Sequence, residues 1–518
     1  MNLISNKDLY DLIKSLSKSE KRFIKLTASA SNIDVILLDL FTKIENLSEY
    51  KEDVFIKSKI KTESTLPKNI ISENLYQFLL KTLRGFYAES SPSLIIKDEI
   101  NNILNLLDKA QYKQCRKILN KQKLVAYQYE RFHFILELIT LEKLLINIER
   151  QFNIKNNTIE DLVKEEQMVI EKAKNLGQYT LLHSKINLNT RQKNKAKTES
   201  DLKKINESLN SDLLKNETQL KSLKSKIIYH HCRSILFCRC QDNQNREEEC
   251  ELLLKIMDGH KELIEEMPGR YITTLSNLIN IAYEEKRYKS CEERIKTLEE
   301  KLSIKAFGAT DLQLKIITAI LNSKIAVYTN SGKLNEAKAV AVEIEKTLEE
   351  YQDKINKEEQ LVFYYNISVM HIYFNDFKKA HQYISLILNE GNNLLREDIQ
   401  SFARILNIII NYELGNIKQL GYLVTTIKNF YKSGVSSFKS EKLIINYFEK
   451  LIQYPEKDKK HIQTLFKDFK QELLELMKDA HETNVTYYFE IEAYIESKIS
   501  EKSLSSILNE KYKKAWLN

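Results

Sequence analysis

The sequence predicts an all-α protein, with a helical bundle at the N-terminal end and a stack of helical hairpins after it. Three observations predict this class. The 518 residues include only 10 glycines and 4 prolines, whereas these two residues together make up about 12% of ordinary proteins. Turns between strands depend on both residues, and helix interiors exclude both. Apolar residues recur at helical spacing, and lysine and glutamate are interleaved as on solvated helix surfaces.

The composition narrows the class of protein further. Hydrophobic residues make up 42% of the chain, which is enough for a long core, so disorder is not expected. The formal net charge of +8 comes from 80 basic and 72 acidic side chains and is mild for a nucleic-acid binder. No signal sequence begins the chain, and no apolar run approaches the ~20 residues of a membrane span. We therefore expect a cytoplasmic protein without membrane insertion.

Residues 1–90 are expected to form the N-terminal helical bundle. Ser17, followed three residues later by Glu20, has the pattern of a helix capping box. Apolar spacing predicts further helices at 33–46, 51–60 and 72–87. A Ser-Ser-Pro-Ser stretch at 90–93 marks the end of the bundle.

Residues 94–455 are expected to form helical hairpins, because one turn pattern recurs there. Each copy has a turn led by glycine or polar residues, then a large apolar residue, and a small or apolar residue three positions later. The copies lie at 286–291, 332–337 and 375–380, with a weaker fourth at 415–420 and another copy near the start of the stack at 110–115. We predict that the small residues are buried where the two helices of a hairpin cross: Cys291, Ala337 and Ala380.

This pattern resembles the tetratricopeptide (TPR) repeat, in which a turn precedes an aromatic residue and then a small residue at the helix crossing. Three pairs fit these positions: Tyr288 and Cys291, Leu334 and Ala337, and Phe377 and Ala380. The small positions lie 40 to 46 residues apart, so the units are longer than the 34 residues of a TPR. The resemblance implies a TPR-like right-handed α-α superhelix. The opening residues also resemble an uncharacterised bacterial family, which implies no function.

Two stretches depart from the hairpin pattern. Residues 191–226 are polar and rich in lysine, and their narrow apolar stripe predicts a long polar helix or a projecting hairpin. Residues 456–518 are expected to form capping helices at 459–479 and 484–515, because the end of a stack must turn a polar face to water.

One group of residues has the composition of a metal site: His230, His231, Cys232, Cys238, Cys240 and Cys250. Zinc ligands normally come in pairs two to four residues apart. On a helix, Cys238 and Cys240 point roughly 200° apart and cannot share an ion. We therefore favour buried thiols in a helix seam and expect no metal or other cofactor.

Motifs of known enzyme classes are absent from the sequence. It contains no Walker loop, no Gly-x-Ser-x-Gly and no His-Glu-x-x-His. Paired glutamates occur within Lys/Glu-rich stretches, where a solvated helix surface explains them. No catalytic residue is assigned, and the protein is not expected to be an enzyme.

The TPR resemblance also implies a binding surface, because the first helices of such repeats line a concave groove. Counting back from the small positions places five residues on that side: Asn280, Tyr283, Asn322, Tyr365 and Tyr412. Asparagine amides can donate to and accept from a peptide backbone, although an ordinary exposed polar face gives the same pattern. The leading hypothesis is a non-enzymatic scaffold or adaptor that binds a peptide or helix of a protein partner.

Two other functions stay open. The first is a nucleic-acid or ribonucleoprotein-associated factor, because basic residues gather in the N-terminal bundle: Lys14, Lys18, Lys21, Arg22 and Lys25. An exposed helix surface produces the same cluster without any phosphate contact. The second is a peptide-sensing regulator that couples the N-terminal bundle to a ligand-binding stack. In layout alone, this resembles quorum-sensing regulators.

Overall fold

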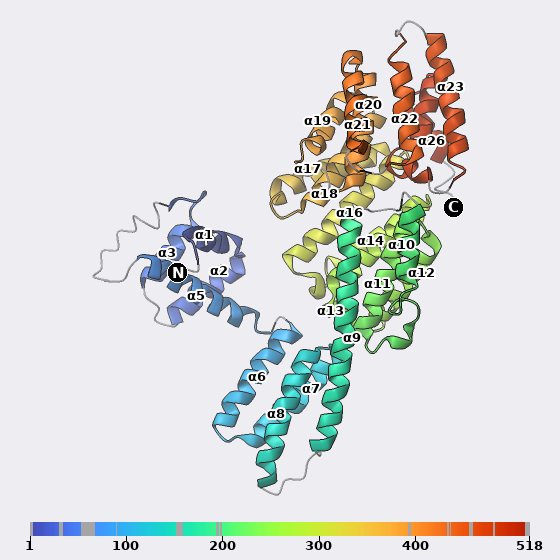
Figure 1. Cartoon of the computed structure of the whole chain (residues 1–518). Coiled ribbons are helices and arrows are strands. Elements are labelled where there is room, and N and C mark those ends of the chain that lie inside the picture. Colours follow the sequence, from blue (N-terminus) through green and yellow to red (C-terminus); the bar gives the residue numbers. More distant parts are fainter. Residues whose placement is uncertain are drawn as a thin grey trace. The chain divides into compact units, whose positions relative to one another are not determined.

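The computed structural model confirms the all-α class (Figure 1). It describes residues 4–30, 35–52, 68–89, 91–151, 159–192, 196, 199–391, 395–432, 435, 437–454, 459–479 and 482–512. These residues contain 25 α-helices and no strand, and none of the helices is both long and apolar enough to cross a bilayer. The chain divides into two compact units, Met1–Ile170 and Glu171–Asn518. The boundaries expected near residues 90 and 456 stay predictions.

The N-terminal bundle belongs to the first unit. Its described helices are α1 (Asn6–Ser15), α2 (Lys18–Ala30), α3 (Val35–Glu45) and α5 (Lys68–Tyr87). Ile13, Phe41 and Leu79 are buried in its core. The predicted capping box is confirmed, since the Glu20 amide donates to Ser17 Oγ at 3.3 Å and the Ser17 amide donates to Glu20 Oε2 at 2.7 Å. Most of the helix expected at 51–60 lies outside the described residues.

After the bundle, the first unit continues with α6 (Pro92–Asp108), α7 (Tyr112–Gln128), α8 (Phe132–Gln151) and the start of α9 (Ile159–Gln192). Helix α7 packs against both α6 and α8. Cys115, the small residue of the copy at 110–115, is fully buried on α7, with its Sγ 3.6 Å from the Ile103 carbonyl oxygen of α6.

The second unit holds the end of α9 and all of the later α-helices of the described residues. They are α10 (Glu199–Leu209), α11 (Leu223–Cys240), α12 (Asn243–Asp258), α13 (Lys261–Glu266), α14 (Pro268–Glu284), α15 (Tyr288–Lys301), α16 (Thr310–Asn330), α17 (Leu334–Tyr351), α18 (Lys357–Tyr373), α19 (Phe377–Leu388), α20 (Glu397–Glu413), α21 (Ile417–Lys432), α22 (Lys439–Leu451), α23 (Lys459–Leu476), α24 (Val485–Tyr488), α25 (Ile491–Ser500) and α26 (Leu504–Tyr512). Within 191–226, the short helix α10 packs against α11, and the described residues do not form one long helix.

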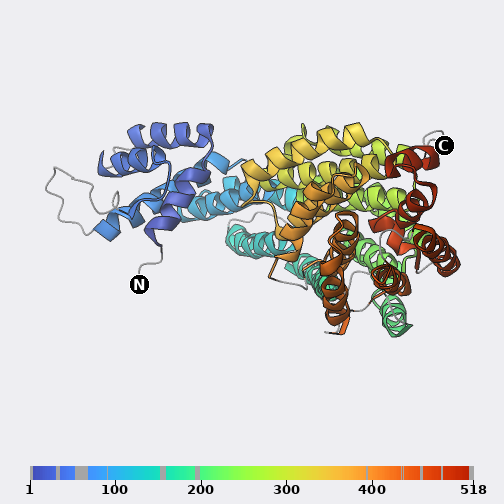
Figure 2. The same cartoon turned by 90° about the horizontal axis from the view of Figure 1, so that it is seen from above.

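Helices α14 to α21 form four consecutive hairpins in two layers. Helices α14, α16, α18 and α20 pack one against the next, and we call them the inner layer. Helices α15, α17, α19 and α21 each pack on a member of that layer, and Figure 2 shows the yellow and orange members of the stack side by side. The arrangement is compatible with a helical-repeat fold.

One turn geometry joins the hairpins. A residue with positive φ stands two positions before the next helix at seven described turns: Ala110, Glu130, Gln241, Lys286, Gly332, Asn375 and Gly415. At six of these turns the following amide donates to the carbonyl five residues earlier, as from Arg287 to Ala282 at 2.8 Å. This is the Schellman arrangement that ends a helix. The turn pattern of the sequence therefore marks a real and repeated structure.

The small residues after these turns are buried, as predicted. Cys291, Ala337 and Ala380 have no exposed surface. The Sγ atom of Cys291 lies 3.6 Å from the Ile279 carbonyl oxygen, and Ser368 Oγ donates to the Ala380 carbonyl at 3.1 Å. In these two hairpins the residue that the sequence pattern indicates contacts the facing helix.

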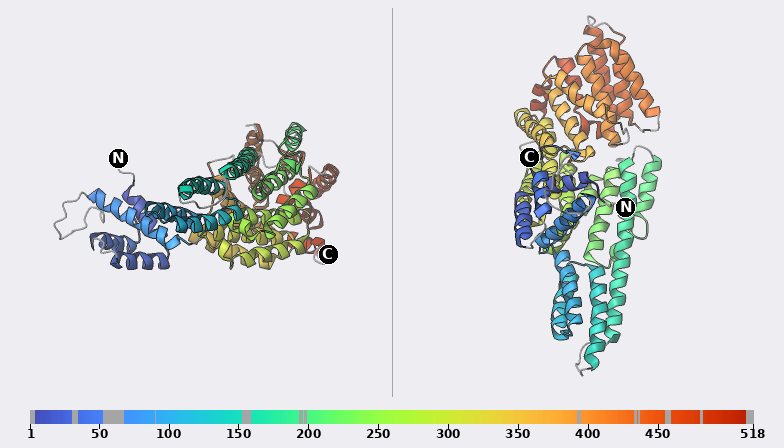
Figure 3. Two further views of the ribbon diagram at one scale, coloured as in Figure 1. Left: turned by 90° about the horizontal axis from the view of Figure 1, so that it is seen from below. Right: turned by 90° about the vertical axis from the view of Figure 1, so that its left-hand side faces the viewer.

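Residues Glu482–Tyr512, which we call the return segment, differ from the prediction. Instead of one helix over 484–515, they contain the three short helices α24, α25 and α26. A left-handed backbone at Glu501 (φ 55°) ends α25, and the segment lies against the inner layer. The Tyr283 hydroxyl bonds to Tyr487, 204 residues further along the chain. Figure 3 shows this red part of the chain beside the green and yellow helices.

Candidate binding site on the inner layer

Three tyrosine hydroxyls of the inner layer hold the backbone of the return segment. The contacts are Tyr283 Oη to the Tyr487 carbonyl (3.4 Å), Tyr365 Oη to the Tyr488 carbonyl (3.2 Å), and the Glu490 amide to Tyr373 Oη (3.1 Å). Burial raises the pKa of all three phenols well above the ordinary value, so they stay protonated at neutral pH. The inner layer therefore holds a short stretch of backbone by the contacts that a peptide ligand would use.

The Tyr488 side chain is anchored at the start of α20. Its ring stacks on Phe402 with the centroids 4.2 Å apart, and its hydroxyl donates to Asp398 Oδ2 at 2.9 Å. Arg396 donates to the same carboxylate from Nε at 2.9 Å and from Nη2 at 2.7 Å. Burial favours the neutral acid, but the Arg396 charge and the hydrogen bonds outweigh it and hold the pKa of Asp398 well below its usual value. Arg396 and Asp398 therefore form a balanced ion pair.

The Glu490 carboxylate fixes the other end of this backbone stretch. Its side chain is 1% exposed and contacts Lys286 Nζ at 2.9 Å, Lys511 Nζ at 3.1 Å and the Tyr512 hydroxyl. Burial opposes ionisation, but the two lysines and the Tyr512 hydroxyl outweigh it, so the pKa of Glu490 is lowered. These charges tie the return segment to the turn before α15.

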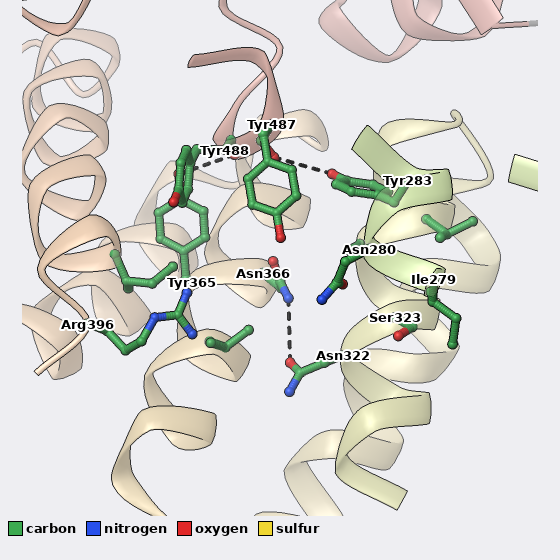
Figure 4. A pocket seen from close by; sticks show the side chains of 14 residues that line it. Ile279, Asn280, Tyr283, Asn322, Ser323, Tyr365, Asn366, Arg396, Tyr487 and Tyr488 are labelled. Atoms are coloured by element: carbon green, nitrogen blue, oxygen red, sulfur yellow. Dashed lines mark hydrogen bonds between the residues drawn. The ribbon is translucent and has the colours of Figure 1, made fainter. Parts of the chain in front are cut away.

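A small polar pocket, which we call the asparagine pocket, lies beside this stretch (Figure 4). Its lining includes Asn280, Asn322, Asn366, Arg396, Tyr487 and Tyr488. The three asparagines come from the successive inner helices α14, α16 and α18. Water can enter a volume of about 90 Å³, which has room for a few water molecules or one small side chain.

The amides of the asparagine pocket have unused hydrogen-bonding capacity. Asn366 Nδ2 donates to Asn322 Oδ1 at a long 3.5 Å, and the Asn280 side chain makes no hydrogen bond within the described part of the chain. Each carboxamide can donate two hydrogen bonds and accept two. Because Asp398 neutralises Arg396, the pocket is suited to a neutral polar group such as a peptide amide.

Four of the five residues predicted to contact a partner meet at this pocket: Asn280, Tyr283, Asn322 and Tyr365. Tyr412 lies elsewhere, where its ring packs against Phe448 of α22 and Phe466 of α23. The hydroxyls of Tyr283 and Tyr365 are already bonded to the return segment, so the expected groove is partly filled by the chain itself. Contact of these residues with a partner stays a prediction.

Ten of the fourteen lining residues were not predicted from the sequence, among them Asn366, Arg396, Tyr487 and Tyr488. A signal for Asn366 was present, since the pocket asparagines recur at intervals of 42 and 44 residues. The two tyrosines have no local signal. They reach the pocket through contacts with helices more than 100 residues earlier in the chain.

The five basic residues of the N-terminal bundle fall into two groups. Lys14 and Lys25 bind the end of α3, where Lys14 Nζ donates to the Glu45 carbonyl at 2.7 Å and Lys25 Nζ pairs with Glu45 Oε2 at 2.6 Å. The other three lie on α2 and have no ion pair among the described residues: Lys18, Lys21 and Arg22. Lys18 and Arg22 are exposed, and Lys21 is half-buried.

Four of the histidines and cysteines near residue 240 are buried: His230, His231, Cys232 and Cys250. His230 Nδ1 bonds to Glu249 Oε2 at 2.8 Å, and Cys232 and Cys250 are fully buried. All six cysteines are free thiols. Within the described residues, no three histidine, cysteine or acidic side chains are arranged to hold a metal ion.

No model of a known protein family matches this chain, and no curated protein matches its sequence.

Proposed function

We propose that this protein is a non-enzymatic binding scaffold of the TPR-like kind, whose inner layer contacts a segment of a protein partner at the asparagine pocket. The observation that supports this proposal is the convergence of three amides from three successive helices on one pocket. Side chains with free donors and acceptors at one point of a layered stack are suited to hydrogen bonding with a peptide backbone.

The return segment shows what this surface can hold. Its backbone is bound by tyrosine hydroxyls on α14 and α18, and the asparagine pocket lies directly beside it. Tyr487 and Tyr488 form one wall of the pocket, so a partner residue inserted there would also contact two aromatic side chains. Aromatic walls around polar contacts are frequent at the energetic centres of protein interfaces.

Site-specific crosslinking tests the proposal. A diazirine amino acid at Ser323, which lines the pocket, should capture a partner protein in cells. The same group at Val342, 46% exposed on the outer helix α17, serves as the control. The crosslink should disappear when Asn280→Ala and Asn322→Ala are combined, and the Kd for the purified partner should rise about tenfold. A crosslink at Ser323 that is unchanged by this double substitution would show that the amides do not recognise the partner.

A second candidate function rests on helix α2. Lys18, Lys21 and Arg22 lie there without ion-pair partners in the described part of the chain, next to the exposed Leu26. A cationic face of this kind fits phosphate groups, as in a nucleic-acid-associated factor.

Binding of a labelled oligonucleotide at several salt concentrations tests this second function. Replacement of the three cations with glutamine should weaken binding. It should also reduce the slope of the logarithm of the binding constant against the logarithm of the salt concentration by about 0.9 for each charge removed. The matched control is a triple glutamine substitution of three exposed lysines on or next to α6 and α7: Lys109, Lys113 and Lys117. Equal loss in both triple variants would exclude a specific role for α2.

A further inference from the structure

Four basic side chains from four helices gather in the second unit, and we call them the basic cluster. They are His183 (α9), His231 (α11), Arg270 (α14) and Lys315 (α16). The rings of His183 and His231 are 5.1 Å apart, and Arg270 Nη1 and Nη2 both lie 3.3 Å from His183 Nε2. The four groups therefore share one small region, apart from the asparagine pocket.

The basic cluster contains no paired acid. Lys315 Nζ donates to the Gly269 carbonyl at 3.0 Å and to Thr273 Oγ1 at 2.8 Å. Asp311 and Glu359 act on Lys315 only through space. Among the residues that the structure describes, neither Arg270 nor Lys315 has a carboxylate within ion-pair distance.

Nearby titratable groups do not supply the missing negative charge. Burial raises the pKa of the Cys232 thiol, which lies near Arg270, to about 12, so the thiol is neutral. Burial and the Arg270 charge lower the pKa of His183 to about 4 and that of His231 well below its ordinary value. Both histidines are therefore neutral at pH 7, and Arg270 and Lys315 have no directly paired negative charge among the described residues.

Two atoms of the cluster also lack hydrogen-bond partners. His231 Nδ1 and Arg270 Nε are buried and make no hydrogen bond to the described residues. Buried polar atoms are normally satisfied, and an unpaired buried charge destabilises a fold. A group that accepts hydrogen bonds and carries negative charge would correct both deficits at once.

We propose that the basic cluster is a binding site for an oxyanion, the carboxylate or phosphate group of a ligand. The guanidinium of Arg270 presents a planar fork of donors that matches such a group, and Lys315 adds a second positive charge. His231 Nδ1 provides a further hydrogen-bonding atom. The bound oxyanion balances the charge that the chain leaves unpaired.

The position of the cluster relates it to the asparagine pocket. Lys315 precedes Asn322 by seven residues on α16, and Thr273 precedes Asn280 by seven residues on α14. Seven residues make two helical turns, so the members of each pair share a face about 10 Å apart, which is the length of about three extended residues. If the oxyanion belongs to a partner's segment, which rests on the proposed function, it is carried by an acidic or phosphorylated residue of that segment. This residue lies about three positions along the segment from the residue that enters the asparagine pocket.

Ligand titration of the full-length protein tests the proposal. Sodium phosphate is one probe and N-acetylglutamate amide the other, at an ionic strength held constant with sodium chloride. The melting temperature should rise and saturate, because ligand that binds the folded state stabilises it. Arg270→Met should raise the Kd at least about tenfold. Arg294→Met is the matched control, since this guanidinium is already paired with Glu251 at 2.8 Å.

The variants also separate binding from a structural role. Without an oxyanion, Arg270→Met should be at least as stable as the wild type, because it removes a partly buried charge that has no paired acid. Tighter binding of phosphate would identify a phosphate group as the ligand, and tighter binding of N-acetylglutamate amide would identify an acidic side chain.

The absence of a saturable response to both probes would overturn the proposal, as would wild-type affinity or a loss of stability in Arg270→Met. The crosslink at Ser323 is measured without either probe. A negative result in the ligand titration therefore leaves the crosslinking test of the asparagine pocket valid, and a negative crosslinking result leaves the titration valid.

Discussion

A single buried carboxylate, Glu490, holds the return segment to the turn before α15. Its lysine partners, Lys286 and Lys511, are 37% and 30% exposed, whereas Glu490 itself is almost fully buried. We expect Glu490→Gln to lower the free energy of unfolding by about 2–3 kcal/mol, because glutamine keeps the shape but leaves Lys286 without its acid and Lys511 with Glu492 alone. Urea denaturation measures this loss. Glu492→Gln, which removes only a half-exposed pair with Lys511 at 2.8 Å, should cost less than about 1 kcal/mol.

The same carboxylate gives the stability a defined pH dependence. The pKa of Glu490 in the folded protein is below its ordinary value of 4.5. The stability from such an acid is fully present above the unfolded-state pKa and is lost as the pH falls toward the folded-state pKa. Wild-type stability should therefore fall between about pH 5 and pH 3, and the Glu490→Gln variant should lose less over that window. Parallel pH profiles for the two proteins would contradict this role of Glu490.

At the scale of the element, the crossing of two helices depends on one methyl-sized residue. Ala380 has no exposed surface, and its carbonyl accepts from Ser368 on the facing helix. Ala380→Leu should force α18 and α19 apart and cost about 1–3 kcal/mol, as overpacking does. Lys378→Leu places the same side chain at an exposed position of α19 and should change the melting temperature little. Equal melting temperatures for the wild type and Ala380→Leu would refute the close crossing.

The turn before α17 depends on a glycine for two reasons. Gly332 has φ +82°, and a Cβ atom there would collide with the Asn509 side chain of α26 and lie 3.4 Å from its Cα. A left-handed conformation costs other residues about 1–2 kcal/mol, so Gly332→Ala should destabilise the protein by at least that amount. Gly421, inside α21, has open space around it.

Gly421→Ala is therefore the matched control, and it should stabilise the protein by about 0.5–1 kcal/mol. Calorimetric melting of both variants measures the difference. A Gly332→Ala protein that melts with or above the wild type would show that neither the backbone conformation nor the contact with α26 matters.

The sequence predicted these hairpins because their signal is local. A residue with left-handed backbone, a large apolar residue and a small residue lie within six positions, and the same hydrogen bond closes the turn at Lys286 and at Asn375. The inner positions of Asn280 and Asn322 follow from that register. Asn366 was missed because the hairpins differ in length, and one residue of shift turns a side chain by about 100°.

At the scale of the whole molecule, the return segment changes how the second unit holds together. In a helical-repeat protein, each repeat contacts only its neighbours, and the repeats can unfold separately. Here one segment contacts α14, α18 and α20 at the same time, through Tyr283, Tyr365 and Phe402. No periodic pattern in the sequence predicts this, since the contacts join residues 123 and 204 positions apart.

We therefore expect these helices to unfold together. Tyr488→Ala removes the ring that stacks on Phe402 and the hydrogen bond to Asp398. Hydrogen exchange should then accelerate in α14 and α18 as well as in the return segment. Tyr422→Ala, at a position 73% exposed on α21, is the control. Faster exchange confined to the return segment would mean that it docks without coupling the hairpins.

The order of synthesis gives the return segment a further consequence. Ribosomes add roughly 5–20 residues per second, and 204 residues separate Tyr283 from Tyr487. Tyr283 on α14 is therefore synthesised roughly 10–40 seconds before Tyr487, the residue that it contacts in the folded protein. During that interval a partner or a chaperone can reach a tyrosine surface that the finished protein encloses. Nascent chains arrested near residue 450 should expose Tyr283 to chemical labelling, and equal protection in arrested and full-length chains would exclude this window.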